Sequence, residues 1–325
     1  GDNAGFAVNG TNSFEVLSGE SAVSGTFNTA IGSGAGGSVL GEKNSAIGLN
    51  AGSGLVGSNN VAIGTYANTG TVVTGSITNS GGDGLFASSF TYADPHRGNN
   101  SVAIGAYSYA RSDNSVALGY TSKATAANSV AIGTNSIASG SQSISIGYKN
   151  VVSGNKSGAI GDPTTILSNG TYSLGNDNSF LAGSDNSGAF GNDNVFLAVA
   201  SGSRAVGNAN SVSNANVFVL GSSVTATVAN SVSLGMGSQQ TGGAGATATS
   251  ANMGSVTNAE VAGVSYGGFA GSQSVGVVSV GSVGAERRVQ NLAAGLITST
   301  STDAINGSQL FVVIDVTNST LASLS

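Results

Sequence analysis

The stretch that decides the fold runs from residue 114 to residue 147 and reads NSVALGYTSKATAANSVAIGTNSIASGSQSISIG. An apolar residue followed by glycine closes a 14-residue unit at Gly119, at Gly133 and again at Gly147. Because a fixed short period is the signature of stacked repeats, this stretch predicts a solenoid. The same landmark recurs on both sides, mostly at the same or a slightly longer spacing, at Gly32, Gly48, Gly64, Gly105, Gly161, Gly175, Gly191, Gly207, Gly221 and Gly235.

Each unit contains two short β patterns. Large and small residues alternate toward the end of the unit, as in Val116-Ala117-Leu118, and a period of two indicates a strand. Residues typical of tight turns, namely Gly, Asn, Asp and Ser, separate this strand from a second one. The sequence therefore predicts an all-β parallel β-roll with one coil of about 14–16 residues per unit. The second strand is marked by an apolar column at Ala110, Ala124, Ala138, Val152 and Ile166.

The small face of the first strand is the most uniform feature of the repeat. A solvent-facing surface would tolerate Lys, Glu and Gln, so we expect another backbone to approach this face closely. One 14-residue coil also encloses too little volume for a generous core. We therefore predict self-association through the small face, and a narrow solenoid that stands alone is the alternative. The small face consists of Ser115, Ala117, Ser129, Ala131, Ser143 and Ser145.

Composition excludes several classes of protein. Gly supplies 52 of 325 residues and charged residues only 7%, against a usual share of about 25%, which fits neither a thick globular core nor a solvated disordered coil. A net charge of −6 without a basic stripe argues against nucleic acid as a partner. The chain has no cysteine and no long apolar run that could span a membrane. Since no N-terminal signal is visible, we expect an internal piece of a longer exported protein.

The repeat is interrupted once and then ends. Residues 66–98 lack it, and we expect a loop or hairpin there whose aromatic residues either bind a partner or fold back onto the coils. Residues 236–285 carry scattered β pattern and are predicted to form a small β-rich connector. Further on, an a/d heptad spacing of 4, 3, 4, 3 predicts the start of a coiled coil, with its seam at Leu310, Ile314, Thr317, Leu321 and Leu324.

Enzyme chemistry is not expected from this sequence. The chain has a single histidine, His96, which lies in the interruption beside Asp94 and Arg97, and we interpret the three as a surface ion pair and not as a catalytic group. Three evenly spaced aspartates, Asp177, Asp185 and Asp193, faintly resemble calcium-binding β-roll turns, but the nonapeptide pattern is absent and turn capping is predicted instead. We therefore predict no catalytic residue, no cofactor and no metal.

Two parts of the chain resemble YadA-like trimeric autotransporter adhesins. Residues 114–119 (NSVALG) and 128–133 (NSVAIG) resemble the head repeat of that family, and residues 287–295 and 302–310 resemble its neck. The resemblance implies a left-handed, homotrimeric β-roll head at 1–235 with an insertion at about 66–98. It further implies a β-prism-like connector at 236–285, a neck at 286–310 and a trimeric coiled-coil stalk from 311 to 325. The neck residues it assigns are Arg287, Arg288, Asn291, Asp303, Asn306, Gln309 and Leu310.

The resemblance also implies a function. Such heads mediate multivalent attachment of Gram-negative bacteria to extracellular matrix proteins such as collagen, to host cells, to other bacterial cells or to abiotic surfaces, and contribute to virulence. The protein would be displayed at the cell surface and held in the outer membrane by a C-terminal barrel outside this chain. A monomeric ice- or glycan-binding solenoid and a trimeric phage or virion fibre are the alternatives. As candidate adhesive contacts we select Tyr109, Tyr120, Lys123 and Tyr148.

Charge is sparse, and part of it gathers where the β-roll meets the stalk. We expect Arg287, Arg288 and Asp303 to form ion pairs between chains, which would fix the register of the neck.

Overall fold

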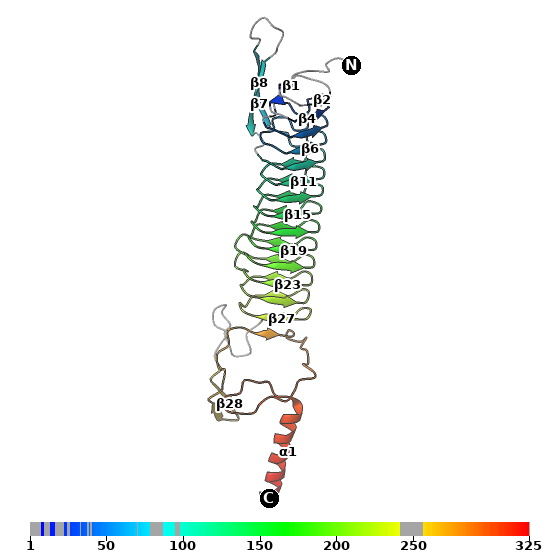
Figure 1. Ribbon diagram of the computed structural model, residues 1–325. Helices are drawn as coiled ribbons and strands as arrows, with labels where there is room; N and C mark the ends of the chain where they lie inside the picture. The colour runs from blue at the N-terminus through cyan, green and yellow to red at the C-terminus, as the bar shows by residue number, and fades with distance from the viewer. Residues whose placement is uncertain are drawn as a thin grey trace.

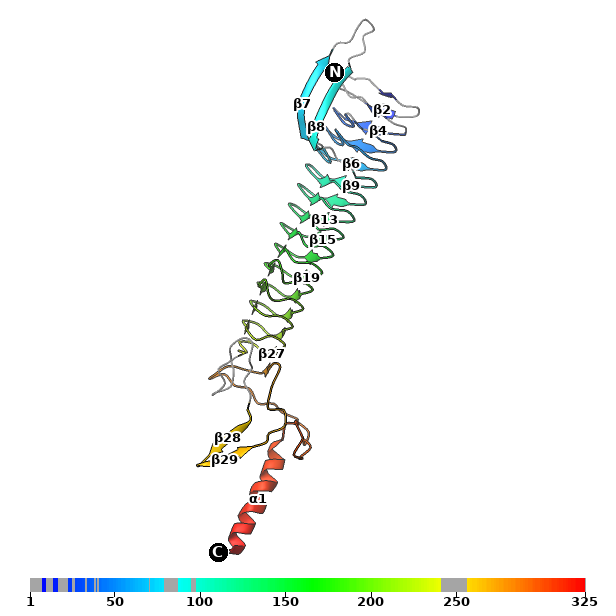
Figure 2. The same cartoon turned by 90° about the vertical axis from the view of Figure 1, so that its left-hand side faces the viewer.

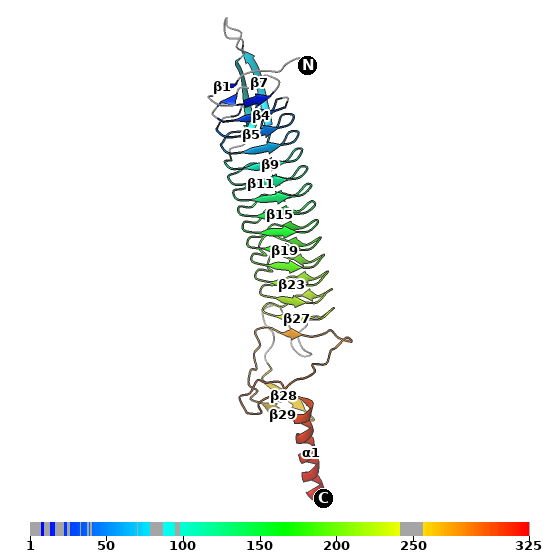
Figure 3. The same cartoon turned by 45° about the vertical axis from the view of Figure 1, so that its right-hand side comes forward.

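The computed structural model describes residues 8–9, 14–16, 23–24, 27–32, 34–37, 39, 41–69, 71–78, 87–94, 98–240 and 256–324. These residues form a narrow rod of stacked coils, followed by a connector and a single helix (Figure 1). The coils succeed one another along one axis, so each contacts mainly the coil before and the coil after it (Figure 3). The predicted all-β parallel solenoid is confirmed.

The larger sheet has 15 strands, and it runs the length of the rod. Equivalent residues of successive coils pair in parallel register, so Ala117 lies between Ala103 and Ala131. Its strands, in spatial order, are β2 (Phe14–Val16), β4 (Thr29–Ile31), β5 (Ser45–Ile47), β6 (Val61–Ile63), β9 (Val102–Ile104), β11 (Val116–Leu118), β13 (Val130–Ile132), β15 (Ile144–Ile146), β17 (Gly158–Ile160), β19 (Tyr172–Leu174), β21 (Gly188–Phe190), β23 (Arg204–Val206), β25 (Phe218–Leu220), β27 (Val232–Leu234) and β30 (Val278–Ser279).

The second sheet has nine shorter parallel strands and closes the other side of the coils. Each of its strands has one buried residue and one that faces outward, as Ala124 and Lys123 do in β12. The strands are β10 (Tyr109–Ala110), β12 (Lys123–Ala124), β14 (Ile137–Ala138), β16 (Val151–Val152), β18 (Thr165–Ile166), β20 (Ser179–Phe180), β22 (Val195–Phe196), β24 (Ser211–Val212) and β26 (Thr225–Ala226).

The landmark glycine turns the chain out of the larger sheet. Gly119 has a φ of +129°, a region that residues with a Cβ rarely adopt, and a Cβ added there would lie 2.7 Å from the carbonyl oxygen of Gly133 in the next coil. Only glycine therefore combines this turn with so close an approach between coils. Asparagine takes a left-handed position at the opposite turn, as at Asn128 with a φ of 56°.

The small face of the larger sheet lies inside the coil. Ser115, Ala117, Ser129, Ala131, Ser143 and Ser145 are each 0% exposed in the single chain. The prediction that these six residues pack against partner chains is therefore wrong. On this side the larger sheet packs against the rest of its own coil, so the backbone that approaches these six residues belongs to the same chain. The large column, which includes Leu118 and Ile144, faces outward instead.

Many polar residues of the interior form hydrogen bonds between coils. The backbone N–H of Asn44 donates to Oδ1 of Asn28 (2.9 Å), and that of Asn60 donates to Oδ1 of Asn44 (3.0 Å). These asparagines form one ladder of hydrogen bonds along the rod. In a second ladder, the backbone N–H of Asn194 donates to Oδ1 of Asn178, and that of Asn210 donates to Oδ1 of Asn194. Since buried amides without partners are costly, these ladders favour the aligned register of the coils.

The interruption of the repeat contains an antiparallel strand pair. Strands β7 (Thr71–Thr78) and β8 (Ala87–Asp94) pair with each other and rise beside the N-terminal end of the rod (Figure 2). Coil stacking continues beneath them, because β6 pairs directly with β9 across the interruption. Of the charged residues named in the interruption, His96 and Arg97 lie outside the described residues.

The remaining elements are small. Strands β1 (Val8–Asn9) and β3 (Val23–Ser24) pair in parallel near the N-terminus, and β28 (Asn258–Val261) and β29 (Val264–Gly267) form an antiparallel pair in the connector. Strand β30 leaves the connector and adds to the end of the larger sheet. The chain ends in helix α1 (Gly307–Leu324), none of whose residues is buried. In the described part of the chain, no helix is long and apolar enough to cross a membrane.

Candidate self-association and binding surfaces

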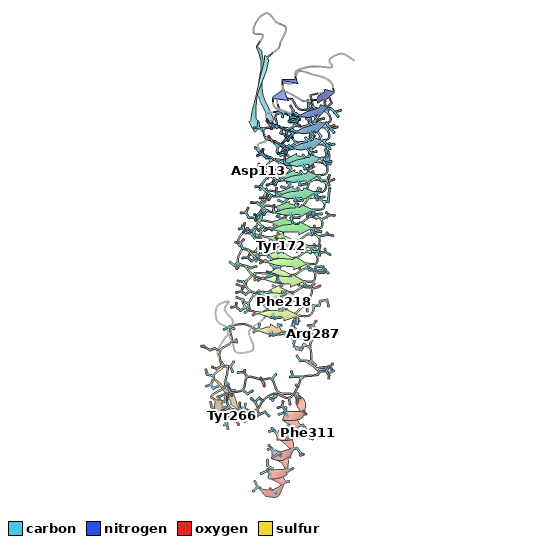
Figure 4. All side chains as sticks on the ribbon, in the orientation of Figure 1. Asp113, Tyr172, Phe218, Tyr266, Arg287 and Phe311 are labelled. Atoms are coloured by element: carbon cyan, nitrogen blue, oxygen red, sulfur yellow. The ribbon has the colours of Figure 1, made fainter. Side chains whose placement is uncertain are left out.

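An apolar stripe runs along the outer face of the larger sheet. It arises because the interior takes the small residue of each strand, which leaves the two large residues outside. Phe190 is 59% exposed, and Tyr172 and Phe218 lie on the same stretch of the rod (Figure 4). Soluble monomers rarely expose a continuous apolar surface of this length, so the stripe indicates a partner. We define the apolar stripe as Leu118, Ile144, Ile160, Tyr172, Leu174, Phe190, Val206, Phe218 and Leu220.

The stripe is hollowed near its C-terminal end. A groove of about 390 Å³ lies there, and its apolar walls are Phe190, Val206 and Leu220. The landmark glycines Gly191 and Gly207 form part of its floor, since they have no side chain to fill the space. A large side chain of a neighbouring molecule fits such a groove.

The neck and helix expose apolar residues in the same way. Leu310, Ile314 and Leu321 of the predicted seam lie on α1, and all three are at least half exposed. Phe311 of the same helix is also exposed (Figure 4). A helix with so much uncovered apolar surface is not stable by propensity alone, so it too indicates association with other helices.

Within the neck, Gln309 joins two segments of the chain. Its Oε1 accepts the backbone N–H groups of Gly295 (2.9 Å) and Asn306 (3.1 Å), and its Nε2 donates to the carbonyl of Gly295 (2.6 Å). The side chain of Asn306 donates to the carbonyl of Leu292 (3.0 Å). These bonds connect the start of the helix to the strand-like segment before it.

In the predicted neck, Arg287 and Asp303 form hydrogen bonds with the backbone of their own chain. Arg287 donates to the carbonyls of Met236 (2.7 Å) and Val280 (2.8 Å) and lies directly below the last coils (Figure 4). Asp303 accepts the N–H of Leu296 (3.0 Å). Arg288, Asn291 and Leu310 are exposed. Ion pairs between chains at Arg287, Arg288 and Asp303 stay a prediction.

An aromatic corner lies where the chain turns from the larger sheet into the smaller one. The rings of Tyr66 and Tyr107 stack 5.4 Å apart and 11° from parallel, and the ring of Tyr120 meets Tyr107 edge-on at 6.2 Å. A groove of about 500 Å³ begins at this corner and extends over the outer face of the smaller sheet. It is lined by Tyr107, Tyr120, Thr121, Lys123, Asn135 and Ile137, which we call the corner groove.

The corner groove contains two of the four candidate contacts, Tyr120 and Lys123. Tyr109 lies beside it, because its strand pairs with β12 and places it next to Lys123. Partial burial raises the pKa of the Tyr109 hydroxyl, and the guanidinium of Arg111 lies 6.0 Å from the centre of its ring. Tyr148 is separate from the groove and has the ammonium group of Lys149 4.8 Å from its ring centre.

Sequence reasoning missed Tyr66 and Tyr107. The long interruption that separates them hides the fact that their coils are neighbours. Both tyrosines stand two places after a landmark glycine, Gly64 and Gly105, and alignment on those glycines could have found the pair.

The three aspartates considered as calcium ligands lie in turns. Asp177 and Asp193 take left-handed conformations, with φ of 56° and 57°. Asp185 accepts the backbone N–H of Asn169 in the preceding coil (2.8 Å). Over the described residues, no group of three or more His, Cys, Asp or Glu side chains could hold a metal ion.

Two comparisons place the coils among known proteins. Residues 110–136 and 138–162 match the model of the YadA head domain repeat. The autotransporter adhesin BtaE of Brucella suis biovar 1 is 58% identical over 48 residues, which are 15% of this chain. The chain spans only 6% of the length of that relative. Both the family and the relative are adhesins and not enzymes, and the head repeat inferred from the sequence is confirmed.

Two solved structures are also similar. The C-terminal YadA-like domain of a Burkholderia pseudomallei protein is 33% identical, with 42% of this chain and 47% of that chain covered and a TM-score of 0.24. The collagen-binding domain of the Yersinia adhesin YadA is 22% identical, with 67% of this chain and 84% of that chain covered and a TM-score of 0.33.

Proposed function

From the YadA head repeats at residues 110–162, we propose that this chain is the head and neck of a homotrimeric, non-enzymatic adhesin of the bacterial surface. The observation that carries the proposal is the apolar stripe, which accompanies these repeats along the outer face of the larger sheet. A chain that leaves so many large apolar residues on the outer face of its larger sheet needs partners to cover them.

Three copies would pack stripe against stripe around a common axis. The exposed apolar seam of α1 supports the same arrangement at the C-terminal end, because a short helix of this kind is covered in a coiled coil. The neck would connect the two regions, with Gln309 and Asn306 fixing the start of each helix. The smaller sheet and the corner groove would remain on the outside of the trimer.

Attachment would be multivalent. Each copy presents the same outer surface, so three weak contacts act together and raise the avidity far above the affinity of one contact. We propose extracellular matrix proteins such as collagen, host cell surfaces, other bacterial cells and abiotic surfaces as the targets, because the head repeat belongs to a family of adhesins. Anchoring in the outer membrane of a Gram-negative bacterium completes the proposal and rests on the autotransporter relative.

Sedimentation of the chain at several concentrations tests the assembly. We expect a species three times as heavy as the single chain of 31.2 kDa. If α1 is too short to hold the trimer alone, a trimeric coiled coil fused after residue 325 supplies the missing stalk. A folded species with the mass of one chain at all concentrations, with and without the fusion, would contradict the trimer.

Binding of the trimer to collagen-coated wells tests the adhesive role. Retention above that on albumin-coated wells is the expected result. If collagen, cultured cells and polystyrene all retain no more protein than albumin does, the adhesive role is wrong even where the trimer is found.

A further inference from the structure

We propose that the corner groove binds an acidic polysaccharide, a chain of pyranose sugars that bear carboxylate or sulfate groups. The inference deepens the adhesive role and rests on it, since it names a ligand class for the outer surface of the head.

The aromatic residues supply the surface that a sugar ring needs. Tyr107 is 49% and Tyr120 53% exposed, although the Tyr107 ring is held between Tyr66, on which it stacks, and Tyr120, which meets it edge-on. A tyrosine offers a broad apolar face and a polar tip, so it can cover the C–H face of a pyranose while its hydroxyl reaches a sugar hydroxyl. Because the rings already pack together, little freedom is lost when a ligand covers them.

Polar groups converge on the same groove. The Thr121 hydroxyl donates to Oδ1 of Asn135 in the next coil, which leaves the Asn135 Nδ2 as a donor in the groove. Lys123 projects from the outer face of β12 and supplies a cation. An open groove of about 500 Å³ that combines two aromatic faces with these polar groups offers both kinds of contact that a carbohydrate makes.

The positive net charge of the coils around the corner groove favours an anionic ligand. Residues 98–160 contain four basic residues and one acidic residue, a net charge of +3, in a protein whose net charge is −6. Residues 161–240 contain one basic residue and four acidic ones, a net charge of −3. The aromatic corner thus lies in the cationic half of the described coils. The basic residues concerned are Arg111, Lys123, Lys149 and Lys156.

The shape and position of the groove favour a polymer. Its lining comes from three successive coils, with Tyr107, Tyr120 and Asn135 each in a different one, so it runs along the rod and not across a single turn. Lys123 and Ile137 stand on the outer face of the smaller sheet, opposite the apolar stripe. A trimer that covers the stripe leaves this face open, and three parallel grooves could hold one long chain or several.

Calorimetric titration of the whole chain tests the proposal. The probes are a heparin octasaccharide, which carries sulfate and carboxylate, a hyaluronan octasaccharide, which carries carboxylate alone, and neutral maltooctaose. We expect at least one acidic probe to bind, maltooctaose to bind far more weakly, and the affinity to fall with added salt. Binding of heparin alone identifies sulfate as the group recognised, and binding of both acidic probes identifies carboxylate. No binding of either acidic probe, or equal binding of all three, overturns the proposal.

Variants locate the site. Tyr107→Ala with Tyr120→Ala should weaken binding of the acidic probe about tenfold or more, and Lys123→Gln should weaken it severalfold and flatten its salt dependence. Lys156→Gln and Tyr266→Ala are the matched controls, because both residues are exposed and lie outside the groove. Equal losses in the controls, or full binding in the groove variants, would overturn the assignment. Sedimentation of each variant separates this outcome from a failure of the trimer, which would change the mass and leave glycan binding measurable.

Discussion

The rings of Phe180 and Phe196 stack 4.5 Å apart and 14° from parallel inside two adjacent coils. These two coils, which end at Gly191 and Gly207, are each two residues longer than the coils before them. The equivalent interior position in the shorter coils is alanine at Ala110, Ala124 and Ala138, and it is Val152 and Ile166 in the two coils just before Phe180. The interior side chain at this position therefore grows from alanine through valine and isoleucine to phenylalanine along the rod.

Removing one of these rings should destabilise the head. Phe196 is completely buried, so Phe196→Ala leaves a cavity and should lower the free energy of unfolding by about 3–5 kcal/mol. Chemical denaturation followed by circular dichroism measures the change. Leu181→Ala is the control, because Leu181 is next to Phe180 but 38% exposed, and it should cost much less. Similar losses for the two variants would show that the stack does not support the coil.

The narrow coils should reject larger side chains on one face only. Ala131 is fully buried between Ala117 and Ser145, whereas its neighbour Val130 faces outward. Ala131→Leu should therefore lower the free energy of unfolding by about 1–3 kcal/mol or more through overpacking, and Val130→Leu should change it little. Thermal unfolding of the two variants in parallel gives the comparison. If Val130→Leu were the more harmful, the assignment of the two faces would be wrong.

Ala131 and Val130 also show which features of the fold could be predicted from the sequence and which could not. Strand positions, the parallel register and the coil length follow from the repeat, because each unit carries the same landmark glycine and alternation. Which face points inward does not follow, since both Ala131 and Val130 are apolar and small residues pack equally well against a partner chain. The outcome depends on the volume that a short coil encloses, and that volume becomes clear only when the two sheets are closed.

The candidate site was only partly predictable for a different reason. Tyr120 and Lys123 belong to the regular repeat, so their outward positions follow from the period. The partner rings Tyr66 and Tyr107 lie on either side of the interruption, and contact between them depends on β6 pairing with β9. A repeat pattern between nearby residues does not predict the pairing of two strands that are so far apart in the sequence.

The apolar stripe can be tested apart from the stability of the coil. Leu174 and Leu220 both face outward, so Leu174→Asp with Leu220→Asp should leave the fold intact while it places charges in the proposed interface. We expect the sedimenting mass to fall from that of the trimer to the 31.2 kDa of a single chain, with an unchanged circular dichroism spectrum. Leu167→Asp, at an exposed position outside the stripe, should remain trimeric. A double variant that stays trimeric would place the interface elsewhere.

The landmark glycines should be intolerant of any side chain. In Gly119→Ala the new Cβ would meet the Gly133 carbonyl at 2.7 Å in a conformation that alanine rarely adopts, and we expect a loss of about 1–3 kcal/mol in the free energy of unfolding. Gly237→Ala is the milder comparison, because Gly237 has a φ of +68°, a region that alanine enters at lower cost, and no atom within 4 Å of the added Cβ. The melting temperature should therefore fall more for Gly119→Ala. Equal shifts would mean that neither the contact between coils nor the φ of +129° makes Gly119 special.

The last prediction concerns the clamp that Gln309 makes in the neck. Gln309→Leu keeps a side chain of similar size but removes the acceptor of the Gly295 and Asn306 N–H groups and the donor to the Gly295 carbonyl. Each of these bonds contributes about 0.5–1.5 kcal/mol, so the protection of the two amides against hydrogen exchange should fall about tenfold or more. Amides of the coils should keep their protection, because they lie in a separate part of the rod.

Gln290→Leu is the control for this clamp, since it makes the same chemical change at an exposed neck position and should leave both amides protected. If Gln309→Leu left the exchange of Gly295 and Asn306 unchanged, the start of α1 would be fixed by contacts other than this clamp. The helices of the trimer would then be the first place to look for them.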